Sequence, residues 1–89
     1  MSIRGSDWIE FSAKVYDHID HYTVPQYGDK VDDLASGYTP NEFIMQMNKY
    51  IKRHGKNSRP GQDKLDLIKI AHYAQMCYTL LEEQENVQK

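Results

Sequence analysis

A run of basic residues between positions 49 and 64 has the clearest chemistry in this sequence. Six of the eleven Lys and Arg residues lie in it, and Asp63 is the one acid among them. Between Asp7 and Glu42 the balance reverses to eight acids and two bases. Positive charge concentrated in this way is typical of a surface that binds phosphate groups or an acidic partner. The predicted phosphate contacts are Lys49, Lys52, Arg53, Lys56, Arg59 and Lys64.

A helix predicted to begin just after Gly61 would direct backbone N–H groups at the same ligand, since helix N-termini attract anions. Tyr27 lies in the segment Pro-Gln-Tyr-Gly-Asp, where an aromatic ring is expected to close over the ligand. The basic run lacks the Gly-x-x-x-x-Gly-Lys-Ser/Thr pattern of an ATP-binding loop. A solvated helix face that keeps the protein soluble is the alternative interpretation of these charges.

Two pairs of residues have the chemistry of metal ligands. His18 and His21 are three residues apart, and Asp63 and Asp66 are one helical turn apart. A polar helix face accounts for the first pair, and stabilisation of acids by a helix N-terminus accounts for the second. The sequence therefore predicts no metal site or cofactor. Mg²⁺ binding is expected only if the protein is a nucleotide hydrolase that uses the aspartates.

The hydrophobic pattern predicts an all-α fold, a three-helix bundle with helices at about 8–22, 40–54 and 62–82. In the first helix, apolar residues recur at spacings of three and four, and Asp7 is expected to cap it. In the second, Thr39 is the expected cap, Pro40 suits the first helical position, and Gly55 is the expected terminator. The first predicted stripe consists of Trp8, Phe11, Val15, Ile19 and Tyr22.

The third predicted helix is apolar on two sides, so one side is expected to be shared with another subunit as a homodimer. Its main stripe, expected to include a buried Cys77, would face the core. The main stripe consists of Leu67, Ile70, Ala71, Ala74, Cys77, Tyr78 and Leu81, and the second of Leu65, Ile68, His72 and Met76.

The connection at 23–38 is long for packed helices, and a short helix from Asp29 to about Gly37 is expected within it. Pro25 to Gly28 would then form a turn. Residues 1–6 and 84–89 are expected to fray. The whole chain, 1–89, is expected to fold as one small helical domain.

The composition excludes several classes of protein. At 27% charged and 39% apolar, the chain is globular in character. No apolar run suggests a signal peptide or a membrane span, and a single cysteine excludes an internal disulfide. These features favour a cytoplasmic protein. The net charge of -2 argues against a general nucleic-acid coating protein.

Residues 40–81 resemble a small phage-encoded domain of the kind labelled nucleotide kinase-like. The matching segments are Asn-Lys-Tyr-Ile-Lys-Arg-His-Gly-Lys at 48–56 and Asp-Lys-Leu-Asp-Leu-Ile-Lys-Ile-Ala-His-Tyr at 63–73. The resemblance implies a phage or prophage origin and a nucleotide-related setting. A thinner similarity is to the helical MazG-like pyrophosphohydrolases, whose paired Glu-x-x-Glu motifs for Mg²⁺ have no counterpart on the helices predicted here.

The sequence therefore favours a helical module that binds a nucleotide or nucleic-acid phosphate, and no catalytic motif indicates an enzyme. Two alternatives remain open. One is a metal-dependent nucleotide hydrolase, and the other is a phage protein that docks on a host factor through its bipolar surface.

Overall fold

The regular structure of the described residues consists of helices, and the starts of two of them have side-chain caps. In the computed structural model, which describes residues 2–29, 37–56 and 59–88, α1 runs Ile3–His18 and continues through a π-helical turn, η1 (Ile19–Thr23), into α2 (Val24–Tyr27). Two longer helices, α4 (Pro40–Lys52) and α5 (Gln62–Gln88), complete the regular structure of these residues. Every regular element in the described ranges is helical, which confirms the all-α prediction.

The first helix is longer at both ends than predicted. It begins at Ile3 because Ser2, and not Asp7, is its cap: the Ser2 hydroxyl accepts a hydrogen bond from the Gly5 N–H at 2.9 Å. It ends at Gly28, whose φ of 93° few other residues adopt. The turn expected at 25–28 is therefore wrong, because residues 24–27 are helical. The short helix expected within 29–37 lies largely outside the described residues.

The π-helical turn lies just before Pro25. A proline inside an α-helix removes one N–H donor, and its ring clashes with the carbonyl four residues earlier. A π-helical turn, whose hydrogen bonds join residues five apart, changes the hydrogen-bond pattern at this point, and such turns are common near functional sites. Thr23, in this turn, is buried.

The second predicted helix is confirmed closely at its start. The Thr39 hydroxyl accepts a hydrogen bond from the Glu42 N–H at 3.4 Å, and Pro40 is the first residue of α4. The helix ends at Lys52, two residues before the predicted end, and Gly55 has the expected positive φ of 77°. The third helix begins as predicted at Gln62 but runs to Gln88, six residues past its predicted end.

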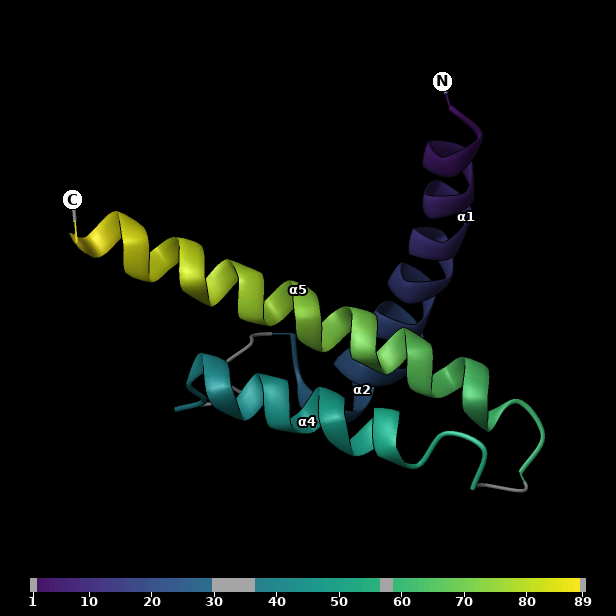
Figure 1. Ribbon diagram of the computed structural model, residues 1–89. Helices are drawn as coiled ribbons and strands as arrows, with labels where there is room; N and C mark the ends of the chain where they lie inside the picture. The colour runs from purple at the N-terminus through teal and green to yellow at the C-terminus, as the bar shows by residue number, and fades with distance from the viewer. Residues whose placement is uncertain (1, 30–36, 57–58, 89) are drawn as a thin grey trace.

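The helices α4 and α5 lie side by side and antiparallel, while α1 crosses α5 and its N-terminal half projects away from the other helices (Figure 1). The centre of the packed region is small. Phe43 of α4 is buried against Met76 and Cys77 of α5. The Cys77 thiol lies 3.7 Å from the Pro40 carbonyl oxygen, which it reaches as a donor. Tyr38, Tyr73 and Leu80 pack around this core.

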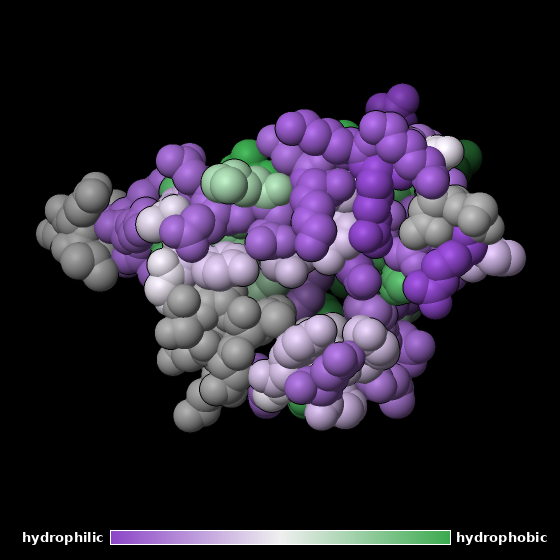
Figure 2. All heavy atoms as spheres, turned by 90° about the horizontal axis from the view of Figure 1, so that it is seen from below, coloured by the Kyte–Doolittle hydropathy of each residue, from purple (hydrophilic) through white to green (hydrophobic). Residues whose placement is uncertain are grey.

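Burial on α5 differs from the predicted order of its stripes. Met76, from the second stripe, is 3% exposed, whereas Leu67 and Tyr78, from the main stripe, are 53% and 64% exposed. The predicted burial of Cys77 is confirmed. On α1, Trp8 is 60% exposed, because this part of the helix projects beyond α5. The face seen in Figure 2, where α4 is nearest, is mostly hydrophilic.

Candidate ligand-binding site

A pocket lined mainly by tyrosines lies where the end of the first helical segment meets α4 and α5. Its volume is about 240 Å³. Five tyrosines and two histidines form most of its wall, with one lysine among them. We call it the tyrosine pocket; its lining residues are His18, Tyr22, Thr23, Tyr27, Tyr38, Tyr50, Lys69, His72 and Tyr73.

Three parts of the chain position these side chains. Residues 18–27 follow one continuous helical path through the π-helical turn, so they supply a wall of the pocket from a single segment. On α5, Lys69, His72 and Tyr73 are three and four residues apart, which places them on one face. Tyr50, in the last turn of α4, lies against that face, and its ring stacks on the ring of Tyr73 with 6.1 Å between centroids.

Positive charge surrounds the ring of Tyr50. The Arg53 guanidinium carbon lies 4.7 Å from the ring centroid, and the ammonium nitrogens of Lys69 and Lys49 lie 5.5 Å and 5.7 Å from it. All three distances are within the range of cation–π attraction, about 6 Å. Because Tyr50 also lines the tyrosine pocket, an anionic group at this edge would meet the field of three cations.

The back of the pocket is an aromatic cluster that continues into the core. The Tyr73 ring lies 6.4 Å from that of Phe43, and the Phe43 ring lies 5.2 Å from that of Tyr38. Burial, with the neighbouring Tyr50 and Tyr38, raises the pKa of Tyr73 to about 12. Its hydroxyl therefore keeps its proton at neutral pH and can donate a hydrogen bond.

The two histidines of the pocket favour their neutral forms. Burial, and then the charge of Lys69, lowers the pKa of His18 below its ordinary value of 6.5. Burial, and then His18, lowers the pKa of His72. Each neutral ring offers one donor and one acceptor nitrogen, so both can contact the polar edge of a ring ligand. Near neutral pH the positive charge at this site therefore comes from Lys69 and its neighbours at Tyr50.

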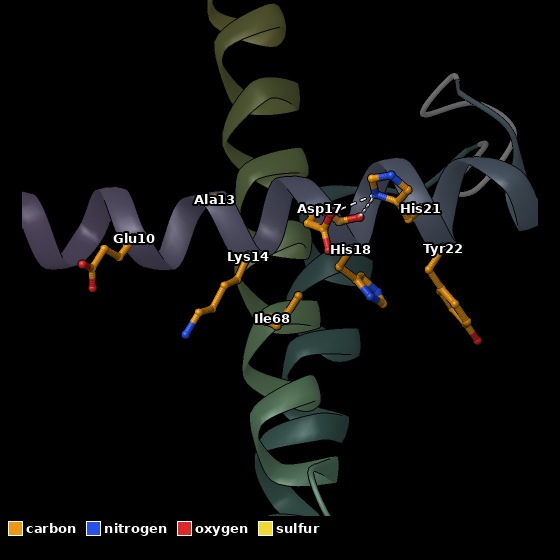
Figure 3. Close-up of a pocket in the computed structure, with 8 residues that line it drawn as sticks. All are labelled: Glu10, Ala13, Lys14, Asp17, His18, His21, Tyr22 and Ile68. Carbon is orange, nitrogen blue, oxygen red and sulfur yellow. Dashed lines mark hydrogen bonds and ion pairs between the residues drawn. The ribbon is translucent and has the colours of Figure 1, made fainter.

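A second, shallower hollow of about 710 Å³ adjoins the tyrosine pocket and shares His18 and Tyr22 with it. It lies where α1 crosses α5 beside Ile68 (Figure 3). Lys14 and Glu10 are at the outer part of the hollow. The shared residues make the two hollows neighbouring parts of one surface.

The structure brings only part of the predicted phosphate site to the tyrosine pocket. Tyr27 lines it, and Lys49 and Arg53 lie beside Tyr50. The remaining predicted contacts are exposed and line neither described hollow: Lys52, Lys56, Arg59 and Lys64.

Arg53 has an internal partner that sequence reasoning did not identify. Its Nε and Nη2 donate to the two oxygens of Asp66 at 2.9 Å and 2.5 Å, and Gln62 donates to the same carboxylate at 2.7 Å. The Asp66 side chain is 5% exposed, and Arg53, with Gln62, lowers its pKa. This bidentate pair joins the end of α4 to α5, and the guanidinium keeps only its remaining N–H groups for a ligand.

The possible metal ligands do not converge. His18 and His21 both line the hollow of Figure 3, but their rings point in different directions, and His21 pairs with Asp17 at 2.9 Å. Asp66 is held by Arg53, and Asp63 lies 3.8 Å from His54. Within the described ranges, no three His, Cys, Asp or Glu residues are grouped so that they could hold a metal ion.

The extended α5 corrects one expectation about the MazG-like motif. Glu82 and Glu85 lie on this helix one turn apart, so one Glu-x-x-Glu sequence is helical after all. The described residues place no further acidic or histidine ligand with them in a metal-binding group. The hydrolase alternative therefore gains no support from this pair.

Sequence reasoning missed Lys69, His72 and Tyr73 as a group. Their spacing on one helix was a usable signal, but His72 fitted the second apolar stripe, and Tyr73 fitted the edge of a core. Tyr22, Thr23 and Tyr27 could not be found in this way, because the approach of these residues to α5 depends on how α1 crosses it. Comparisons with protein families, curated proteins and solved structures give no significant match to this chain.

No helix in the described parts of the chain has the length and apolar character needed to cross a membrane.

Proposed function

We propose that this protein is a binding module for a nucleotide-class ligand, with the flat ring in the tyrosine pocket and the phosphate beside Lys69 and Lys49. The observation that carries the proposal is the tyrosine-lined cavity with three cations around Tyr50 at its edge. The predicted phosphate site is thereby moved from the end of α4 and the following loop to the contact between α4 and α5.

The size and lining of the pocket suit a single ring system. Pockets for whole drug-sized ligands occupy roughly 300–1,000 Å³, so the cavity of about 240 Å³ holds a smaller group. Stacking on an aromatic side chain stabilises a nucleobase by about 1–3 kcal/mol per base. Tyr27, which is 46% exposed at the pocket wall, can turn onto the outer face of the ring.

The charges supply the second half of the recognition. Lysine binds phosphate as a mobile point charge, so Lys69 and Lys49 can leave the Tyr50 ring for an incoming phosphate. Arg53 is paired with Asp66, which offsets its charge, so its role is to hold Tyr50 in place. Lys52, Lys56 and Lys64 are exposed and can contact further phosphates of a longer strand.

The resemblance to a nucleotide kinase-like phage domain points to the same ligand class. No observation favours the hydrolase alternative over binding. Of the two aspartates that it would use, Asp66 is ion-paired with Arg53, and Asp63 lies near His54. Docking of a host protein on the bipolar surface becomes the better explanation if nucleotides do not bind.

Isothermal titration of the full chain with nucleoside mono- and triphosphates, and with the parent nucleoside, tests this proposal. We expect the phosphorylated ligands to bind more tightly than the nucleoside, and binding to weaken as salt is added. A Lys69→Met variant should bind at least about tenfold more weakly, because a charge-assisted contact contributes roughly 1.5–3 kcal/mol.

Lys64→Met is the matched control, because Lys64 is an exposed lysine of the same helix outside both described hollows. It should bind a mononucleotide like the parent. Absence of binding by every nucleotide at low salt, or equal losses in the two lysine variants, would contradict the proposal.

A further inference from the structure

The helix α5 carries apolar residues on three sides, and the structure covers only two of them. One side packs on α4 through Tyr73, Cys77 and Leu80. A second side meets α1 through Ile68 and His72. At 100° per residue, the third side lies roughly 120° from each of these. We call it the open face of α5; its residues are Leu67, Ala71, Ala74, Tyr78 and Leu81.

Four of the five residues of the open face are exposed to solvent, and Ala71 is half-buried. Leu67, Tyr78 and Leu81 are 53%, 64% and 43% exposed, and Ala74 between them is exposed too. A helix that is apolar on all sides is normally buried on all sides. At 27 residues, α5 is about 40 Å long, and the 13 residues of α4 cover about half of that length.

The solvent-accessible surface area of the chain is larger than that of a compact monomer of the same mass. A compact monomer of 10.5 kDa exposes about 5,400 Å², whereas this chain exposes 7006 Å². The excess of about 1,600 Å² exceeds the roughly 800 Å² that each partner contributes to a stable interface. The radius of gyration, 14.5 Å, is likewise larger than the roughly 12 Å expected for a compact domain of 89 residues. The projecting half of α1 accounts for part of both values.

We propose that the open face of α5 binds the same face of a second copy of this chain, with the two α5 helices antiparallel. The spacing of Leu67, Ala74 and Leu81 is seven residues, which keeps them in line with a facing helix. In the antiparallel arrangement the two-fold axis passes near Ala74, where the small side chains allow close approach. Leu67 then faces Leu81 of the second copy, and Ala74 faces Ala74 of the second copy.

The charges beside the open face select the antiparallel direction. Lys64 and Glu82 are both exposed and lie on the same flank of α5, eighteen residues apart. Flanking residues of one kind face each other in an antiparallel pair, so Lys64 lies beside the turn that contains Glu82 and Glu85 of the second copy. The nearby Glu82 carboxylate raises the pKa of the Tyr78 hydroxyl, so this carboxylate lies next to the open face.

A second copy satisfies this pattern without any other partner, because Leu67 and Leu81 are reflections of each other about Ala74 and Ala74 meets its own copy. The interface is independent of the tyrosine pocket, since none of the five residues of the open face lines either described hollow. Loss of nucleotide binding would therefore leave this inference intact, and loss of the dimer would leave the pocket proposal to its own test.

Sedimentation velocity of the full chain over a concentration series tests the interface. The parent should sediment as a dimer, and Ala74→Glu should weaken association by about a hundredfold or more, because two carboxylates would meet at the axis. Ala74 is exposed in a single copy, so this variant should keep the helical circular dichroism of the parent. Met45→Glu, at a 67% exposed apolar residue of α4, is the matched control and should remain dimeric.

Disulfide trapping tests the direction of the helices. Leu67→Cys protein mixed with Leu81→Cys protein should give a linked dimer on oxidation, while each variant alone should give little. Cys77 is 5% exposed and should not contribute. A parent that is monomeric at every concentration, an Ala74→Glu variant as dimeric as the parent, or efficient linking of each variant alone would overturn the proposal.

Discussion

Burial, more than ion pairing, sets the chemistry of the individual residues around the tyrosine pocket. It holds His18 and His72 in their neutral forms and keeps the Tyr73 hydroxyl protonated. Three cations lie near the ring of Tyr50 because of where they stand in the chain and the fold. Lys49 precedes Tyr50, Arg53 follows three residues later, and Lys69 approaches from α5. A polar pocket with a positive edge results from ordinary residues placed close together.

The depressed pKa values of the two histidines predict a stability that depends on pH. In the unfolded chain these groups take up protons near their ordinary value of 6.5, whereas in the folded chain they resist protonation to lower pH. The unfolded state thus binds more protons in this window, so the free energy of unfolding should be highest above 6.5 and should fall as the pH drops below it.

Urea unfolding at several pH values measures this dependence. His72→Gln should flatten it, because the buried group that resists protonation is removed. His21→Gln is the control, since its side chain is 76% exposed, and it should keep the slope of the parent. A parent stability that rises on acidification below 6.5 would show that the two rings are not held neutral.

At the scale of elements, the join between α4 and α5 depends on the Arg53–Asp66 pair. Its two partners differ in exposure: the Asp66 side chain is 5% exposed and that of Arg53 is 34% exposed. Removing Arg53 leaves a buried carboxylate with Gln62 as its remaining partner, whereas removing Asp66 leaves a guanidinium that water reaches.

We therefore predict that Arg53→Ala destabilises the protein by about 3 kcal/mol and Asp66→Ala by about 2 kcal/mol, since breaking a buried pair leaves an uncompensated charge. Glu83→Ala, which removes an exposed acid of α5, should change the free energy of unfolding by less than about 0.5 kcal/mol. Chemical denaturation monitored by circular dichroism gives all three values. The reverse order for the two pair variants would mean that the carboxylate is hydrated in the folded protein.

The sequence was informative about elements where local capping decides the structure. Thr39 and Pro40 begin α4 as predicted, because the cap and the first helical position are properties of neighbouring residues. The end of the first helical segment was missed, because a proline preceded by a π-helical turn resembles a loop in sequence. The far end of α5 was also missed, since the polar residues after Glu82 carry no apolar pattern although the helix continues through them.

Which apolar side of α5 is covered is decided at the scale of the whole molecule. The periodicity showed two apolar sides of this helix but could not rank them, because the angle at which α1 crosses α5 depends on contacts between distant residues. For the same reason, the basic residues that cluster between positions 49 and 64 of the sequence do not all lie at one site in the structure. Lys49 and Arg53 lie at the tyrosine pocket, whereas Lys56 and Lys64 do not line it. The distribution of charge along the chain predicted one cluster of cations, and of these, among the described residues, only Lys49 and Arg53 lie beside Tyr50.

The two proposals assign separate roles to two surfaces of the molecule: the tyrosine pocket would bind a ligand, and the open face of α5 would bind a second copy. The ligand surface is the central claim, and it differs from the sequence-based site in its location. A ligand bound at the end of α4 and the following loop would contact Lys56 and Lys64, whereas a ligand in the tyrosine pocket would contact Tyr38, Lys69 and Tyr73.

Amide chemical shifts of the labelled protein, followed by nuclear magnetic resonance during titration with a nucleoside monophosphate, distinguish these locations directly. We predict saturable shifts at Tyr38, Lys69 and Tyr73, with Lys56 and Lys64 little changed. Shifts confined to the basic loop, or a spectrum that the nucleotide leaves unchanged, would contradict the account.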